Sequence, residues 1–260
     1  MAGCLLMSSL DRPTVLILGG TAEAVALAEK LVGRWGDAFE IVTSLAGRTS
    51  APVAVRGAVR TGGFGGAAPM TTYLRDHRVC AVLDATHPFA VGISENARIA
   101  AEAANVPRIA LVRPNWTPEP GERWHMVPDI TAAARALPHY GRRAFLTTGR
   151  TELDAFSTCS GVWFLVRLIE RPDAPLPLAD HKIVLGRGPF TVAQEQDVME
   201  NHKIDVLVCK ASGGEATRAK LSAAKLCDIP VVMIERPVPS AGEQTQSVEG
   251  VAEWFAAKFG

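Results

Sequence analysis

Glycines and a hydroxyl directly follow the first apolar run of this sequence, a combination suited to holding a phosphate. Residues 14–18 read TVLIL, and Gly19, Gly20 and Thr21 come next, before an alanine-rich helical stretch. Glycine lets the backbone approach a ligand closely, and the first turn of a helix offers unpaired N–H groups with positive dipole character. The pattern is either an ordinary strand-to-helix turn or a phosphate-binding turn. We favour the second, with Thr21 both capping the helix and donating to the phosphate.

The second apolar run, residues 39–44, ends in hydroxyls and an arginine where an NAD site usually has a carboxylate. Ser44 and Arg48 lie in the stretch TSLAGRTS. Asp or Glu at this place binds the ribose 2′-hydroxyl of NAD, whereas a guanidinium suits the additional 2′-phosphate of NADP(H). We therefore expect Ser44 and Arg48 to bind the 2′-phosphate of NADPH. Further on, Gly63 in the glycine cluster 61–66 either lines the pyrophosphate or belongs to a flexible connector.

A hydroxyl ends the apolar run of residues 80–86, and a histidine follows it directly. Thr86 and His87 lie in the stretch DATHPFA, and the next helix is expected to be capped by Ser94. A histidine with a pKa near about 6.5 can give a proton at neutral pH. Thr86 and His87 are the candidate catalytic residues, with His87 as the candidate proton donor or as a positioning group.

The second half of the chain repeats the combination of an apolar run, glycine and one basic side chain. Arg150, Arg187 and Lys210 each lie in such a turn, and Ser212 follows the last of them. Cationic side chains in glycine turns suit a ligand that carries several carboxylates. We expect these four residues to bind the substrate.

The elements that must position these residues alternate between buried strands and helices. Besides the three runs named above, we expect strands at residues 108–112, 143–148, 162–167, 181–186, 204–210 and 230–235. Nearly continuous Val, Ile and Leu runs are typical of parallel strands covered on both faces, and strand–helix alternation implies right-handed crossovers. The proline-rich stretch 113–124 interrupts the pattern. We predict an α/β protein of two Rossmann-like domains with parallel sheets, residues 1–113 for NADPH and residues 114–260 for the substrate, with the active site in the cleft between the domains.

Composition limits the function classes. The chain has 260 residues, 27 basic and 27 acidic side chains, and 48% hydrophobic residues. A net charge of zero argues against coating a nucleic acid, and no apolar run approaches the about 18 residues of a membrane span. The five cysteines form no Cys-x-x-Cys pair and indicate a reduced, cytoplasmic protein without a metal site.

Several common catalytic patterns are missing from the sequence. Neither tyrosine, Tyr73 or Tyr140, has a lysine four positions later, as a short-chain dehydrogenase would. The Gly-x-Ser-x-Gly turn of serine hydrolases, the P-loop and a zinc-ligand set are also missing.

Five motifs in series make this sequence resemble the precorrin-6A reductase family of cobalamin biosynthesis. ILGGTAEA, SLAGR, DATHPFA, GRGPF and KASGG occur in this order, and the resemblance runs from about Thr14 to the C-terminus. It implies two α/β domains with the active site between them. It also implies reduction of precorrin-6A to precorrin-6B by hydride transfer from NADPH to a double bond of the macrocycle.

Other readings stay open from the residues alone. One is a reductase of the cobalt-containing precursor, cobalt-precorrin-6A. Others are a non-catalytic NADP(H)-sensing regulator and an NADPH reductase of a small carbonyl or enone. A monomer is the expected state of such a two-domain chain.

Overall fold

The computed structural model describes residues 12–47 and 53–260. They form two compact units, one comprising the chain up to Arg113 together with Pro237–Gly260 and the other comprising Pro114–Arg236. Each unit is built on one six-stranded sheet in which every strand pair is parallel. The predicted α/β class with two parallel sheets is confirmed.

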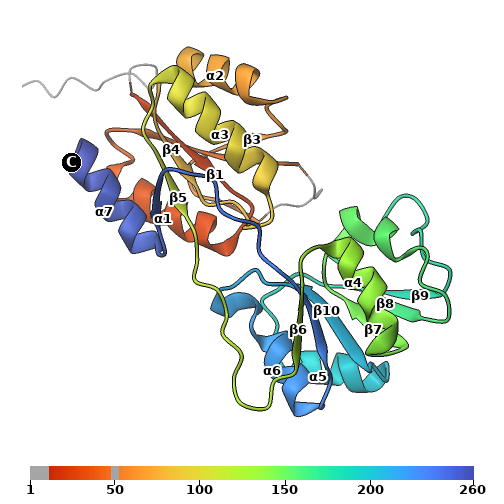
Figure 1. Ribbon diagram of the computed structural model, residues 1–260. Helices are drawn as coiled ribbons and strands as arrows, with labels where there is room; N and C mark the ends of the chain where they lie inside the picture. Colours follow the sequence, from red (N-terminus) through yellow and green to blue (C-terminus); the bar gives the residue numbers. More distant parts are fainter. Residues whose placement is uncertain (1–11, 48–52) are drawn as a thin grey trace, which may run out of the picture. The chain divides into compact units, whose positions relative to one another are not determined.

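The first sheet has the strand order β12-β5-β4-β1-β2-β3 (Figure 1). Its strands are β1 (Thr14–Leu18), β2 (Glu40–Leu45), β3 (Ala58–Thr61), β4 (Val79–Asp84), β5 (Arg108–Leu111) and β12 (Glu243–Thr245). The helices of this unit are α1 (Ala22–Trp35), α2 (Ala67–Asp76), α3 (Val91–Ala104) and α7 (Val248–Phe259).

Every residue of β1 is buried, because helices cover both faces of the sheet. Val15 and Ile17 pack in one apolar cluster with α1 and α7. Leu16 and Leu18 point the other way, into a cluster with α2 and α3. This alternation explains why the strand is apolar at four consecutive positions, Val15 to Leu18.

The second sheet has the order β6-β11-β10-β7-β8-β9. Its strands are β6 (Trp124–Val127), β7 (Arg143–Leu146), β8 (Trp163–Leu168), β9 (His181–Leu185), β10 (Val206–Lys210) and β11 (Val231–Ile234). The α-helices are α4 (Ile130–Ala136), α5 (Val192–Asn201) and α6 (Ala219–Leu226), and short 3-10 helices are η1 (Leu137–His139), η2 (Arg150–Phe156) and η3 (Glu215–Thr217).

Both sheets have six parallel strands, but the edge strands β12 and β6 come from different places in the chain. Beside β5 in the first sheet lies β12, which follows the whole second unit in the chain. Beside β11 in the second sheet lies β6, which precedes every other strand of that unit. The chain therefore leaves the first unit after β5 and returns to it with β12.

This return corrects the predicted domain boundary. The division after residue 113 agrees with the prediction, but residues 237–260 belong to the first unit instead of the second. The reason is the packing of α7, whose Phe255 is fully buried with its ring centroid 5.1 Å from those of Trp35 and Phe39. Figure 1 shows α7 beside α1.

The cysteines of the described residues are thiols without disulfide partners. Burial raises the pKa of Cys80 and of Cys209 to about 11, so both stay protonated near neutral pH, as small apolar side chains do. Cys4 lies outside the described residues.

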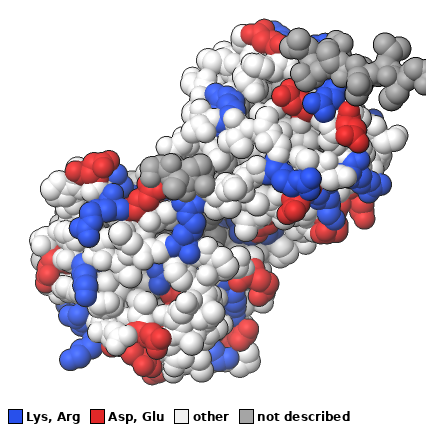
Figure 2. Space-filling model, turned by 180° about the vertical axis from the view of Figure 1, so that it is seen from behind, with Lys and Arg blue, Asp and Glu red and all other residues white. Residues whose placement is uncertain are grey.

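Charges on the surface are mixed. On the face drawn in Figure 2, Lys and Arg lie among Asp and Glu without a single basic patch. In residues 12–47 and 53–260, no helix is long and apolar enough to cross a membrane, and no three His, Cys, Asp or Glu side chains form a metal-binding group.

Candidate active site

In each sheet, several of the predicted site residues follow the two neighbouring strands between which the strand order reverses. In the first unit β1 and β4 are neighbours, so the Gly19–Thr21 turn and the Thr86–His87 segment leave the same edge of the sheet. Ligands of doubly wound sheets bind at this edge, beyond the carboxyl ends of the strands.

The glycine turn after β1 is shaped by close approach to β2. The Gly19 N–H donates to the Ser44 carbonyl at 2.9 Å, and a Cβ at Gly19 would lie 2.8 Å from Thr43 Cγ2. Gly20 has φ +107°, and a Cβ there would meet nothing within 4 Å. The turn therefore requires glycine, and its open side at Gly20 fits the close approach of a phosphate.

Thr21 caps α1, as predicted, but its hydroxyl has a second use. Thr21 Oγ1 accepts from the Ala24 N–H at 3.1 Å and donates to the Ala85 carbonyl at 2.7 Å. A hydroxyl has one proton, and that of Thr21 is donated to the Ala85 carbonyl. The prediction that this side chain donates to a phosphate is therefore wrong for this arrangement. The unpaired backbone N–H groups of the first turn of α1 are the donors that fit a phosphate.

A carboxylate on that first turn is paired with an arginine that follows β5. Glu23 Oε1 lies 3.0 Å from Nη1 of Arg113, whose side chain is nearly buried. Burial lowers the pKa of Arg113, and Glu23 opposes that effect. The pair limits the repulsion that Glu23 would exert on an anion at the turn. A pair this distant in the chain leaves no spacing signal in the sequence and was not predicted.

At the end of β2, the structure adds a cation that the sequence analysis did not select. Ser44 is buried, and its Oγ accepts from Nη1 of Arg60 at 3.1 Å. Arg60 Nη2 also donates to the carbonyl of Gly63 at 2.9 Å. Arg48, the predicted partner of the 2′-phosphate, lies outside the described residues.

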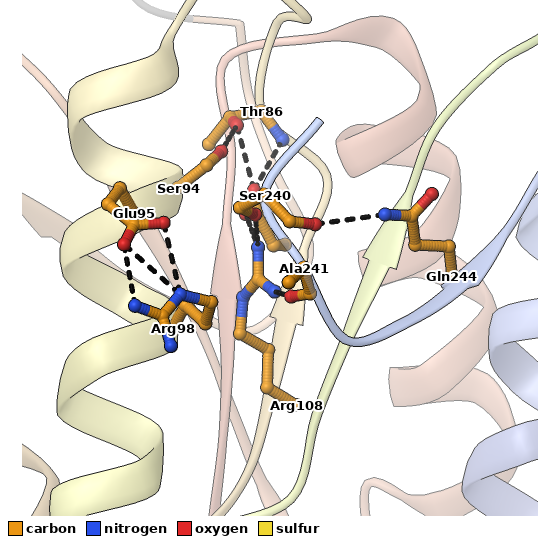
Figure 3. Close-up of polar contacts among 9 residues, drawn as sticks. Thr86, Ser94, Glu95, Arg98, Arg108, Ser240, Ala241 and Gln244 are labelled. Atoms are coloured by element: carbon orange, nitrogen blue, oxygen red, sulfur yellow. Dashed lines mark hydrogen bonds and ion pairs between the residues drawn. The ribbon is translucent and has the colours of Figure 1, made fainter. Parts of the chain in front are cut away.

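Thr86 is held by a buried network (Figure 3). Its Oγ1 donates to Asp84 Oδ1 at 2.7 Å and lies 3.0 Å from Ser94 Oγ, which is then the donor to Thr86. The hydroxyl proton of Thr86 is thus directed to Asp84. Ser94 is not the helix cap that we expected: α3 begins at Val91, and Ser94 lies in its first turn and contacts Thr86.

The network continues through an ion pair. Asp84 Oδ2 accepts from Nη2 of Arg108 at 2.7 Å, and both side chains are at least 95% buried. The same nitrogen donates to Ser240 Oγ at 2.7 Å, and Nη1 donates to the Ala241 carbonyl at 3.3 Å. Asp84 and Arg108 therefore join the Thr86 turn, β5 and the returning C-terminal segment.

His87 is exposed, and its ring orientation is fixed from within its own turn. Nδ1 accepts from the Phe89 N–H at 3.2 Å. In the neutral ring the proton is then on Nε2. In this tautomer Nε2 is a hydrogen-bond donor.

In the second unit, three of the four predicted substrate residues follow the neighbouring strands β7 and β10. Arg150 begins η2 directly after β7, and Lys210 ends β10. Ser212 is buried and lies just beyond Lys210. Arg187 instead follows β9, the edge strand, two places from β7.

Lys210 has a carboxylate partner that the sequence analysis missed. Its Nζ lies 2.6 Å from Glu152 Oε2 on η2, and the two side chains are 15% and 31% exposed. The backbone of Ser212 is fixed as well, because its carbonyl accepts from Nη2 of Arg236 at 2.8 Å. The two turns are thus ordered by contacts within the unit.

Comparison with known proteins covers nearly the whole chain. The sequence model of the family described as "Precorrin-6x reductase CbiJ/CobK" matches residues 14–256. A precorrin-6A reductase of Rhodococcus erythropolis is 49% identical over 241 residues, covering 92% of this chain and 96% of that protein. A cobalt-precorrin-6A reductase of Priestia megaterium is 29% identical over 249 residues, covering 91% and 96%.

A solved structure gives the same result for the fold. The chain is similar to one titled "CobK precorrin-6A reductase", with a TM-score of 0.90 and 42% identity over 95% of this chain and 97% of that one. The fold, the two polar sheet edges and these matches agree: the chain belongs to the precorrin-6x reductase CbiJ/CobK family of cobalamin biosynthesis and is an oxidoreductase.

Proposed function

We propose that this chain reduces precorrin-6A to precorrin-6B with NADPH as the hydride donor. The observation that carries the proposal is the similarity over nearly the full length to precorrin-6A reductases, at 49% identity to the Rhodococcus protein. Identity to the cobalt-precorrin-6A reductase is 29%, which favours the metal-free substrate over the cobalt-containing one.

The residues of the first unit fit a dinucleotide. NADPH, when bound, supplies the hydride. The N–H groups at the start of α1 and the open backbone at Gly20 would hold its pyrophosphate, and Ser44 with Arg48 its 2′-phosphate. Whether Gly63 contacts the nucleotide stays a prediction.

The residues of the second unit fit a macrocycle with acidic side chains. Arg150, Arg187 and Lys210 would pair with substrate carboxylates, with Ser212 as a neighbouring hydrogen-bonding residue. Because Lys210 is 2.6 Å from Glu152, a substrate carboxylate would have to share or replace that partner. Glu152 therefore competes with the substrate for this lysine.

The proton that completes the reduction is assigned to His87. The acid form is the imidazolium, which would give up its Nε2 proton and keep the proton on Nδ1, so the bond from the Phe89 N–H to Nδ1 would have to open in that form. The Thr86 hydroxyl proton is instead directed to Asp84. Thr86 then shapes the turn, and its remaining lone pair can accept a hydrogen bond from the substrate.

The direct test is to mix the purified protein with NADPH and precorrin-6A and to follow nucleotide oxidation together with the visible spectrum of the pigment. Oxidation of NADPH coupled to the spectral change supports the proposal. Parallel reactions with NADH and with cobalt-precorrin-6A measure both preferences. If the protein reduces cobalt-precorrin-6A but not precorrin-6A, the cobalt-containing compound is the substrate. If neither the nucleotide absorbance nor the pigment spectrum changes, the proposal is refuted.

The proton assignment predicts that His87→Ala lowers kcat by about 10²–10⁴-fold, the usual contribution of a general acid. The affinity for NADPH should stay unchanged, and the alkaline limb of the pH–rate profile, where a general acid loses its proton, should change. His77→Ala is the matched control, because His77 is stacked on Tyr73 beside α2. Near-normal turnover by His87→Ala would leave His87 as a positioning group only.

For the substrate site, we expect Lys210→Met to raise the KM for precorrin-6A by about 10–100-fold, the loss of one charge-assisted hydrogen bond. The Kd for NADPH, measured by titration without substrate, should not change. Lys225→Met is the control, because Lys225 of α6 pairs with the exposed Glu119 at 3.4 Å. A weaker NADPH complex with an unchanged KM would assign Lys210 to the cofactor.

A further inference from the structure

Arg60 lies beside the predicted 2′-phosphate site but was not part of the sequence prediction. In the parallel pairing of β2 and β3, Arg60 is the partner of Ser44, so both side chains project from the same face of the sheet. Their contact is the 3.1 Å bond from Arg60 Nη1 to Ser44 Oγ. Both residues stand one position before the end of their strands, at the edge where dinucleotides bind.

The guanidinium of Arg60 is held in one orientation before any ligand arrives. Nη1 donates to the Gly62 carbonyl at 2.6 Å, and Nη2 donates to the Gly63 carbonyl at 2.9 Å. The group also lies over the Phe64 ring, 3.8 Å from its centroid, and 5.2 Å from the centroid of Tyr73. A cation fixed in this way loses little conformational entropy when it binds an anion.

The hydrogen-bond directions leave this pair able to bind a phosphate. Arg60 is the donor to Ser44, so the serine retains its own hydroxyl proton for another acceptor. The three bonds named above use three of the five N–H donors of the guanidinium. Serine and arginine together therefore offer a hydroxyl donor and a positive charge, which match the oxygens of a phosphate monoester.

We propose that Arg60 acts with Ser44 in binding the 2′-phosphate of NADPH and is a determinant of the preference for NADPH over NADH. The inference rests on the proposed function, because it assumes a nucleotide on the first sheet. It differs from the sequence prediction in adding a cation from β3. The aromatic contacts and carbonyl bonds set the position of that cation.

The test measures binding of two nucleotide fragments, 2′,5′-ADP and 5′-AMP, by isothermal titration calorimetry of the full chain. Arg60→Met keeps a long apolar side chain against Phe64 but removes the charge. We expect it to weaken 2′,5′-ADP about 10–100-fold and 5′-AMP less than about twofold, since only the first carries the 2′-phosphate. The Kd values for NADPH and NADH should show the same difference.

Arg56→Met is the matched control. Arg56 is exposed and precedes β3, so it lies at the other end of the same strand from Arg60. This variant should bind both fragments as the unaltered chain does. Ser44→Ala, a smaller change, should also weaken 2′,5′-ADP selectively and gives a second readout if Arg60→Met does not fold.

Two outcomes would overturn the role of Arg60. Equal losses for both fragments would show that Arg60 only shapes the glycine loop, and unchanged binding of 2′,5′-ADP would show that it does not contact the phosphate. In either case the unaltered chain would still prefer 2′,5′-ADP and reduce precorrin-6A. If the unaltered chain binds neither fragment and does not oxidise NADPH, the proposed function fails as well.

Discussion

Arg108→Met is expected to destabilise the first unit by about 3–5 kcal/mol, the cost of leaving one partner of a buried ion pair uncompensated. Asp84 would keep its bonds from Thr86 but lose the cation 2.7 Å from its Oδ2. At 3% side-chain exposure, water cannot replace that cation without opening the unit. Urea unfolding followed by circular dichroism measures the loss.

The control for Arg108 is another arginine with an equally short carboxylate contact. Arg98 lies 2.6 Å from Glu95 and 2.7 Å from Glu102, but these carboxylates are 43% and 67% exposed. Surface pairs contribute about 0–1 kcal/mol, so Arg98→Met should change stability by no more than that. Equal effects of the two substitutions would show that burial is not what makes the Asp84–Arg108 pair important.

Phe255→Ala is expected to destabilise the first unit by about 3–5 kcal/mol, because it removes a fully buried aromatic ring. The ring fills the space between Trp35 of α1 and Phe39 before β2. The helix that carries it follows the second unit in the chain, so this effect also tests the corrected domain boundary.

Phe255→Ala should destabilise the first unit and not the second, because the two units have separate cores. Trp35 and Trp163 lie in different units, and single-tryptophan variants retaining either one report the unfolding of each unit separately. Phe255→Ala should lower the midpoint at Trp35 and leave that at Trp163 unchanged. Phe259→Ala, which removes a half-buried ring of the same helix, should have a smaller effect. A loss of stability at Trp163 alone would contradict the assignment of α7 to the first unit.

Much of the fold was predictable, because buried parallel strands have a strong pattern. The predicted runs 14–18 and 80–86 correspond to β1 and β4, and the proline-rich break after residue 113 is where the chain enters the second unit. The strands β3, β6 and β12 were not predicted. They have three or four residues and are largely exposed or only half buried, so their sequences lack the continuous apolar run of a central strand.

The candidate site was predictable where residues follow strands and was not where distant side chains meet. The turn at Gly19 and the segment at Thr86 were found, because the chain order places them at strand ends. The partner of Lys210 and the cation beside Ser44 were missed, because each contact joins separate elements. The expected cleft between the domains, the monomeric state and the cytoplasmic location stay predictions.

By itself, the sequence determined the α/β class, the two parallel sheets and the family, because apolar periodicity and short motifs are local properties. Only the tertiary structure decided which unit receives residues 237–260 and which way the hydroxyl protons of Thr21 and Thr86 point. An amphipathic helix can cover either sheet, and a hydroxyl can donate to any nearby acceptor. Those choices depend on packing between segments far apart in the chain, where Phe255 meets α1 and Asp84 meets Arg108.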